Sequence, residues 1–218
     1  VFDLLRDWPD VEKRHARIPE ANPLRDWIAR ETKLGNPTLK AEVERTGDPV
    51  LKRALEWSQA VNAAIADLVH DVPPFPFVRE SLEKISPWAD ILVCSATPGE
   101  ALQREWEEHH IAGYAAVIAG QEMGSKREHI QLAASGRYQK GRVLMIGDAP
   151  GDLKAARPNG ALFFPVNPGR EDQSWELFLN EAADKFYQGE YTAEYEAHLV
   201  AEFDQLLPET PPWKKERR

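Results

Sequence analysis

Residues 143–152 of this chain read VLMIGDAPGD, and this stretch carries the strongest prediction of fold and function. The four apolar residues at 143–146 have the length and composition of a buried β-strand. Gly147 and Asp148 follow directly, and Asp152 stands four residues beyond Asp148. Two carboxylates at a strand's carboxyl end suit Mg²⁺, because this ion uses few protein carboxylates and keeps several waters. The alternative is a turn in which Asp152 only caps the next helix, but the complete pattern favours the metal site.

Short apolar runs of the same kind recur on both sides of this stretch. The runs lie at 91–94, 117–118, 143–146 and 161–164, and helices are expected between and beside them at about 77–86, 99–109, 126–135 and 152–157. Strands that alternate with helices indicate an α/β fold with a parallel sheet that helices cover on both faces. In such sheets the chemistry lies at the carboxyl ends of the strands.

Two further positions near strand ends carry polar residues. Ser95 follows the run 91–94, where its hydroxyl and the backbone N–H of Ala96 can face a phosphate. Lys126 stands at an expected helix start, where the macrodipole disfavours a cation unless that cation neutralises an anion. Taken singly, each residue has a simpler interpretation: Ser95 as a cap or turn residue, and Lys126 as a solvated surface lysine.

Helices are expected at both ends of the chain. Asn22-Pro23 and Asp48-Pro49 each combine an N-cap residue with a proline at the first helical position, and Gly35 is expected to stop the first of these helices. The prolines of 73–76 end the second helix. Helical spacing of apolar residues returns over 175–203. We therefore expect a helical cap at 1–72, an α/β core at 73–174, and a helical C-terminal extension at 175–218 that packs on the core.

The composition excludes several classes of protein. The 218 residues are 42% hydrophobic and 29% charged, as in a globular protein. The net charge of −9 argues against a nucleic-acid partner, which needs a basic surface. No apolar run approaches the roughly 20 residues of a membrane span, and the start lacks the features of a signal peptide. The single cysteine, Cys94, suits a reducing cytoplasm.

Together, Ser95, Lys126 and Gly147-Asp148-x-x-x-Asp152 resemble the second, third and fourth motifs of the haloacid dehalogenase (HAD) superfamily, in their order and approximate spacing. The resemblance covers about 77–168, and its most specific part is the Gly-Asp-x-x-x-Asp element. The segments ANPLRDWI (21–28), ETKLGNP (31–37), SATPGEAL (95–102) and GDAPGD (147–152) are similar to an uncharacterised bacterial subgroup of HAD hydrolases.

The resemblance implies a HAD-like Rossmannoid core with a helical cap, and a Mg²⁺-dependent phosphatase that acts on a small phosphorylated metabolite through an aspartyl-phosphate. Ser95, with Ala96 beside it, would bind the transferring phosphoryl group. Lys126 would hold both the nucleophile and the phosphate. Asp148 would ligate Mg²⁺, and Asp152 would ligate it or orient its waters. The cap would close over the substrate and exclude water.

The family's nucleophile and its general acid/base form an Asp-x-Asp pair at the end of the first core strand, and this sequence contains no Asp-x-Asp. The nearest match is VFDLLR at 1–6, in which Leu5 stands at the acid/base position. Either Asp3 is a surviving nucleophile or residues 1–8 belong to a cap helix and the motif lies upstream. The helical spacing of Leu4, Leu5 and Trp8 favours the cap helix. We therefore expect a truncated chain that is inactive by itself.

Two other functions stay open at this point. A dehalogenase with the same fold would need no Mg²⁺, and it has little use for a metal carboxylate at Asp148. A non-catalytic HAD-like binding or scaffold protein is favoured by the missing nucleophile. Arg17, His15, Arg25 and Lys33 are candidates for recognising the substrate, although each is also a typical surface charge.

Overall fold

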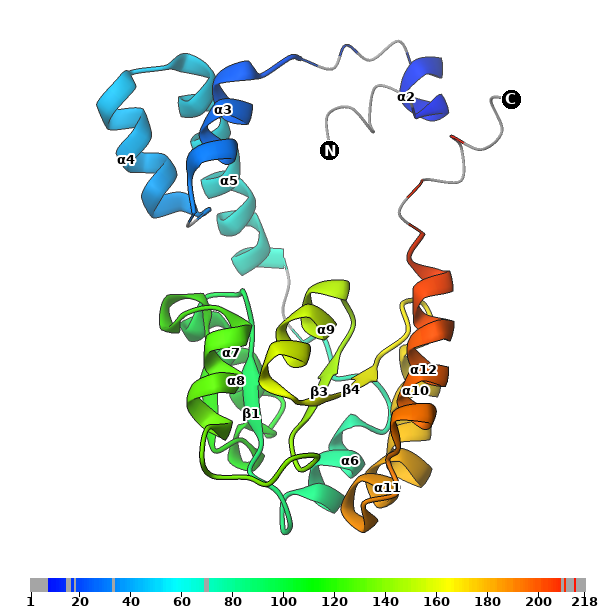
Figure 1. Ribbon diagram of the computed structural model, residues 1–218. Helices are drawn as coiled ribbons and strands as arrows, with labels where there is room; N and C mark the ends of the chain where they lie inside the picture. The colour runs from blue at the N-terminus through cyan, green and yellow to red at the C-terminus, as the bar shows by residue number, and fades with distance from the viewer. Residues whose placement is uncertain are drawn as a thin grey trace. The chain divides into compact units, whose positions relative to one another are not determined.

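The strands form at the apolar runs of the sequence, and they pair in two separate sets. The computed structural model describes residues 8–14, 17, 19–32, 34–68, 71–208, 210 and 214. Within these residues, β1 (Leu92–Cys94) pairs with β2 (Val117–Ala119), and β3 (Leu144–Gly147) pairs with β4 (Leu162–Pro165). Both pairs are parallel, which confirms the predicted strand direction (Figure 1). The described strands form two two-stranded sheets instead of the single sheet that we expected.

Alternate residues of β3 and β4 pack against different sets of helices, so this strand pair is covered on both faces. Leu144, Ile146 and Phe164 belong to one cluster, and Val143 and Met145 pack against another. The first cluster draws on α6 (Val78–Ile85), α10 (Glu171–Leu177), the π-helical turn η4 (Phe178–Ala182), α11 (Ala183–Gln188) and α12 (Ala193–Leu206). The second draws on α8 (Lys126–Ala134) and α9 (Pro150–Ala156). This two-sided cover is the arrangement predicted for an α/β protein.

Burial along the strands is uneven. Phe163 and Phe164 of β4 are completely buried, whereas every residue of β1 and β3 is only partly buried. In a complete parallel sheet the inner strands are buried on both faces and paired along both edges. β1 and β3 each pair along one edge only within the described part of the chain. They are therefore incompletely covered for strands of this kind.

The remaining elements connect these strands. They are α7 (Gly99–Glu108), η1 (Ala112–Tyr114), η2 (Gln121–Met123) and η3 (Arg157–Asn159). Two polar contacts fasten α12 and the residue two positions before it to η3 and to β4. The hydroxyl of Tyr191 donates to the carbonyl oxygen of Phe163 at 2.7 Å, and Arg157 pairs with the buried Glu196 at 2.6 Å.

The N-terminal part consists of helices in the described residues: α2 (Pro9–Lys13), α3 (Asn22–Arg30), α4 (Asn36–Thr46) and α5 (Pro49–Leu68). Its core is a cluster of Trp27, Leu39, Leu51 and Leu55 from the last three helices. The predicted start of α5 is confirmed. The Asp48 carboxylate accepts the N–H groups of Val50 at 2.8 Å and Leu51 at 3.1 Å.

Three predicted helix boundaries are wrong. Ala21, in the left-handed region at φ 48°, occupies the N-cap position, so Asn22 is the first residue of α3 instead of its cap. The helix ends at Arg30, and Gly35 precedes α4 instead of ending α3. α9 begins at Pro150, earlier than the expected 152, because proline suits the first turn of a helix.

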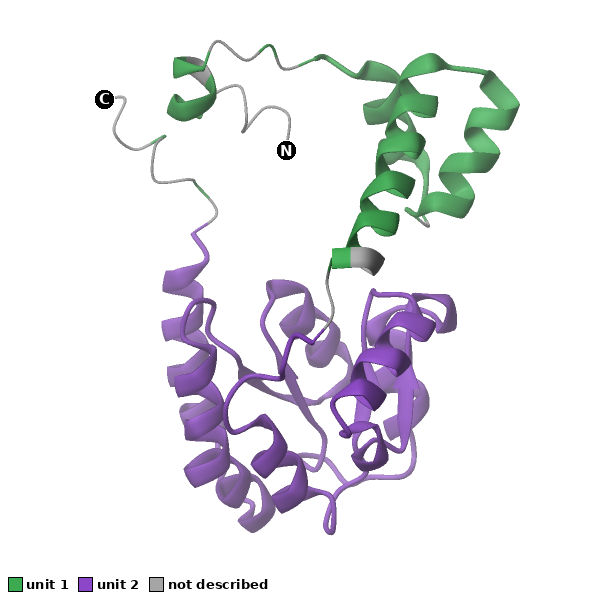
Figure 2. Ribbon diagram, turned by 180° about the vertical axis from the view of Figure 1, so that it is seen from behind, with its two compact units in different colours: residues 1–70, 209–218 green, residues 71–208 purple. Residues whose placement is uncertain are grey.

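The chain divides into two compact units, residues 1–70 with 209–218 and residues Asp71–Pro208 (Figure 2). The strands and the helices α6 to α12 all belong to the second unit. No helix within the described residues combines the length and the apolarity that crossing a bilayer requires. Asp3, Leu5, His15 and Lys33, named above, lie outside the described residues.

Candidate functional site

Lys126 and Asp152 form an ion pair between two helix starts. The Lys126 ammonium lies 2.5 Å from Oδ1 of Asp152, whose side chain is only 2% exposed. Ser125 and Glu128 fix the start of α8 through a capping box, in which the Glu128 N–H donates to the Ser125 hydroxyl and the Glu128 carboxylate accepts the Ser125 N–H. Lys126 is therefore the first residue of a well-defined helix, and its charge offsets that of a buried carboxylate.

Asp152 also belongs to the turn between β3 and α9. Its Oδ2 accepts the N–H of Ala149 at 3.2 Å, so both carboxylate oxygens have a partner. Gly147 is required beside it, because a Cβ atom at that position would lie 2.5 Å from the Cβ of Asp152. The bond to the Ala149 N–H is the contact of a helix-start residue, whereas the bond to Lys126 belongs to neither interpretation that the sequence offered for Asp152. Its position is the third of the helix, not the N-cap.

Ser95 lies one residue beyond β1, in a turn of its own. Its N–H donates to the carbonyl of Ala119 at 3.0 Å, and its hydroxyl oxygen accepts the N–H of Thr97 at 3.1 Å. This is the local turn considered as the simpler interpretation. It uses Ser95 Oγ as an acceptor and leaves the O–H able to donate to a ligand.

The thiol of Cys94 shows that the end of β1 is close to the ion pair. Burial raises its pKa to about 11, Lys126 lowers it and Asp152 raises it by smaller amounts. Both charges therefore act on the last residue of β1, directly before Ser95. The starts of α8 and α9 thus meet at the ion pair, and both of its charges reach the end of β1. The structure pairs Lys126 with Asp152, a contact that was not expected.

Asp148 differs from Asp152 in being open to solvent. It is exposed, directly follows β3, and makes no hydrogen bond or ion pair within the described residues. A carboxylate that shares Mg²⁺ with waters and a substrate phosphate has this character. The protein ligands are few, however, since the described residues contain no group of three acidic, His or Cys side chains that could hold a metal. Within the described residues, Asp148 is therefore a single exposed carboxylate at the end of β3 and not part of a cluster of metal-binding side chains.

Sequence reasoning missed Glu122 and Thr97. Glu122 lies in η2, and both of its carboxylate oxygens accept the N–H of Gly99, at 2.9 and 3.2 Å. Thr97 accepts the N–H of Gln121 through its carbonyl at 3.1 Å. Both residues lie in short loops that follow strands, but nothing in the local sequence indicates that these two loops bind each other.

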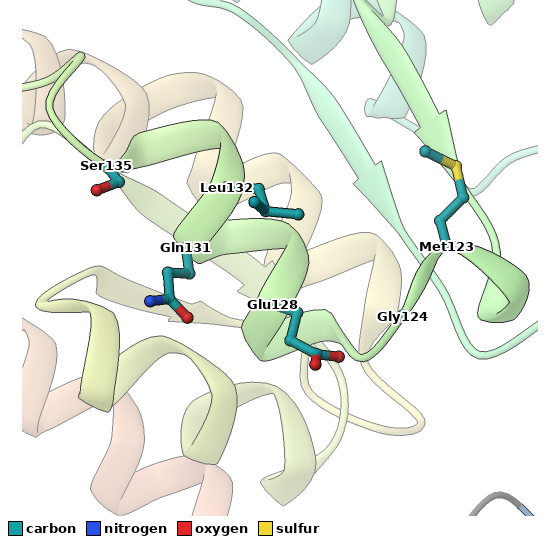
Figure 3. A pocket seen from close by; sticks show the side chains of 6 residues that line it. All are labelled: Met123, Gly124, Glu128, Gln131, Leu132 and Ser135. Atoms are coloured by element: carbon teal, nitrogen blue, oxygen red, sulfur yellow. The ribbon is translucent and has the colours of Figure 1, made fainter.

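A surface hollow of about 470 Å³ lies on a different face of α8 (Figure 3). Its lining consists of Met123, Gly124, Glu128, Gln131, Leu132 and Ser135. Helical spacing separates this face from the one that carries Lys126 and Ile130. The hollow is therefore distinct from the strand-end site, and it includes none of the residues that the sequence selected there.

Two of the substrate-recognition candidates lie in the described part of the N-terminal unit. Arg25 donates from Nε to the carbonyl of Glu20 at 2.9 Å, and Arg17 is exposed. The chain matches no family model, no curated protein and no solved structure in the three comparisons. Its class is that of a mixed α/β protein with short parallel strand pairs.

Proposed function

We propose that the protein is a Mg²⁺-dependent phosphohydrolase of the HAD superfamily that acts on a small phosphorylated metabolite through an aspartyl-phosphate. The observation that carries this proposal is the Lys126–Asp152 ion pair beside the carboxyl end of β1. A lysine ammonium has three N–H donors, and Asp152 uses one of them. The others can serve a nucleophilic carboxylate and a phosphoryl oxygen, which the HAD resemblance assigns to this lysine.

The loop after β1 supplies neutral donors for the phosphoryl group. The Thr97 N–H fixes the oxygen of the Ser95 hydroxyl, so the O–H can point away from the turn. The N–H of Ala96 is a second donor, and it has no hydrogen-bond partner in the described part of the chain. Fixed donors of this kind stabilise the charge that develops on a transferring phosphoryl group.

Asp148 would hold Mg²⁺, which supplies charge neutralisation for the phosphoryl oxygens. Asp152, with both oxygens engaged, would orient the site by holding Lys126 and the β3–α9 turn instead of ligating the metal directly. The sequence analysis left Asp152 either as a Mg²⁺ ligand or as a residue that orients the waters of the metal, and its two hydrogen bonds favour a positioning role over direct ligation.

The nucleophile would come from a strand between β1 and β3. Such a strand would join the two parallel pairs into one sheet and would end beside Ser95, Lys126 and Asp148. The partial burial of β1 and β3, against the full burial of Phe163 and Phe164 on β4, supports a missing neighbour at this place. The Asp-x-Asp pair would stand at the end of this strand.

The test is hydrolysis of p-nitrophenyl phosphate by the protein expressed from its complete gene, with and without Mg²⁺. We expect Mg²⁺-dependent turnover that Asp148→Ala lowers by about 10²-fold or more, because the substitution removes a metal ligand. Asp204→Ala is the matched control, since Asp204 is also exposed but lies on α12. Equal activity of Asp148→Ala and the wild-type protein would overturn the metal assignment.

A second function is favoured by the absence of any Asp-x-Asp in the 218 residues. The same donors and Asp148 would then bind a phosphorylated ligand without hydrolysing it. Calorimetric titration of inorganic phosphate with Mg²⁺ distinguishes the two functions. Binding without turnover in the complete-gene protein supports the non-catalytic function, whereas turnover excludes it. A haloacid dehalogenase would instead release chloride from a haloacid without Mg²⁺.

A further inference from the structure

Three hydrogen bonds from backbone N–H groups join the loop after β1 to the last residue of β2 and to the loop that follows it. The Ser95 N–H donates to Ala119, the Gln121 N–H donates to Thr97, and the Gly99 N–H donates to the Glu122 carboxylate. The first two are neutral bonds between main-chain groups. The third is charge-assisted, and it places a carboxylate on the first residue of α7, where the helix dipole favours an anion.

The backbones of the two loops also touch directly at Gly99 and Gly120. A Cβ atom on Gly120 would collide with the backbone of Gly99, and a Cβ atom on Gly99 would collide with the Glu122 carboxylate. Glycine at 120 is therefore required for this approach, whereas a side chain at Gly99 would displace the end of the Glu122 side chain. The contact between the loops is therefore a closely packed interface and not an incidental meeting of two surface segments.

We infer that Glu122 is a positioning residue that holds the Ser95 turn in register with the segment leading to Lys126. The inference rests on the proposed function, because it concerns the Ser95 hydroxyl and the Lys126 ammonium, which were assigned there to the phosphoryl oxygens. Glu122 touches neither group. It acts through Gly99 on the loop that contains Ser95 and Thr97, and through the short helix η2 on the start of α8.

The contact between Glu122 and Gly99 also limits which N–H and O–H groups can bind the phosphoryl group. Because Glu122 occupies the N–H of Gly99, the start of α7 already carries its anion. A phosphoryl group next to that carboxylate would meet a like charge. The phosphoryl group is therefore bound on the Ser95, Ala96 and Lys126 side, and the role of Glu122 is to set the separation between those donors.

The experiment compares Glu122→Ala and Glu122→Gln with the wild-type protein from the complete gene. Measured quantities are kcat and KM for p-nitrophenyl phosphate, the inhibition constant of inorganic phosphate, and Tm. We expect Glu122→Ala to weaken phosphate inhibition and to lower kcat/KM, each by roughly tenfold, because misplaced donors lose part of their transition-state contact. Glu122→Gln keeps an oxygen acceptor for Gly99 and should recover most of the loss.

Glu100→Ala is the matched control, because Glu100 is an exposed acidic residue in the first turn of the same helix, and it makes no described contact with the loop after β2. It should leave kcat/KM and phosphate inhibition within about twofold of wild type. If Glu122→Ala lowers Tm but leaves both kinetic quantities within that range, Glu122 only stabilises α7 and the inference is overturned.

Amide hydrogen exchange separates this inference from the proposed function, since it requires no catalysis. In Glu122→Ala, exchange at Gly99 and Gln121 should become faster by about tenfold or more, because the two loops open together. Unchanged exchange at Gln121 would show that the loops are not coupled through Glu122, whatever the activity. If exchange becomes faster but the protein shows no phosphatase activity, Glu122 does link the two loops, and only the role of that link in catalysis is overturned.

Discussion

The burial of Asp152 depends on the contacts of individual neighbouring atoms. A carboxylate whose side chain is only 2% exposed is costly to bury unless its charge is offset and its lone pairs are used. Lys126 provides the charge, the Ala149 N–H provides a second bond, and the absence of a side chain at Gly147 provides the space. Loss of either hydrogen bond would leave the buried carboxylate with an unused lone pair, and a side chain at position 147 would push the carboxylate out of place.

We expect Gly147→Ala to destabilise the protein by about 1–3 kcal/mol, because the added methyl group overlaps Asp152 and cannot be accommodated without displacing it. Gly151→Ala is the control from the same segment, since a Cβ atom there meets nothing within 4 Å. That substitution should be neutral or stabilising by up to about 1 kcal/mol in α9. Urea denaturation measures both, and equal stability of the two variants would contradict the overlap.

Cys94 reports on the same charges through its pKa. With the pKa raised to about 11 by burial, only about one thiol in a thousand is ionised at pH 8 in the folded chain. We expect iodoacetamide to react about a hundredfold more slowly with the folded chain than with the chain in urea. Lys126→Met should slow the reaction further, because Lys126 lowers this pKa. A folded-state rate equal to the unfolded rate would contradict the raised pKa.

The same pKa has a consequence for stability at alkaline pH. Because the folded-state value of about 11 lies above the ordinary value of 9.0, the folded chain keeps its proton where the unfolded chain has lost it. Unfolding therefore releases a proton between these two values, and the contribution of Cys94 to stability falls as the pH rises through that window. Cys94→Ala should show a smaller decrease in Tm over the same window.

At the scale of elements, the apolar runs predicted where strands form. The run 143–146 became β3 (Leu144–Gly147), and the run 161–164 became β4 (Leu162–Pro165), each displaced by one residue. The displacement follows from pairing, because the ladder extends to Gly147 opposite Pro165. Strand positions follow from local composition, and their exact ends follow from partners elsewhere in the chain.

Contacts between distant segments were outside the reach of local patterns. The Lys126–Asp152 pair joins residues 26 apart, and the Gly99–Glu122 contact joins residues 23 apart. The resemblance of Ser95, Lys126 and Gly147-Asp148-x-x-x-Asp152 to the HAD motifs is what grouped Lys126 and Asp152 in one expected site. The sequence analysis assigned no role to Glu122, since an acidic residue in a loop is ordinary. The division into two strand pairs was equally unpredictable, because periodicity identifies strands without ordering them.

At the scale of the whole molecule, the C-terminal helices are structural members of the strand-bearing unit. Phe178, Ala182, Tyr191 and Leu199 form one cluster with Phe164 of β4. The sequence placed a domain boundary after residue 174, but the helices beyond it complete the apolar core of the same unit. The compact unit ends at Pro208.

Truncation tests this arrangement. A chain that ends at residue 174 should lose cooperative unfolding of the strand-bearing unit, because one face of β3 and β4 would lose its apolar cover. A chain that ends at Pro208 should keep a Tm within about 2–4 °C of the whole chain. Circular dichroism during heating measures both. A cooperative transition in the shorter chain would show that α10 to α12 are dispensable.

Because α12 follows the strands in the sequence, it is synthesised after the strands that it covers. Residues 144–164 leave the ribosome before the helices that will cover one side of them, and the contacts of Tyr191 with Phe163 and of Glu196 with Arg157 cannot form until those later residues have been made. During that interval the nascent chain displays Leu144, Ile146, Leu162 and Phe164 without their apolar partners. Exposed strand surface of this kind attracts other chains and chaperones. A pause in translation before residue 191 therefore prolongs a stage in which this apolar strand surface is uncovered.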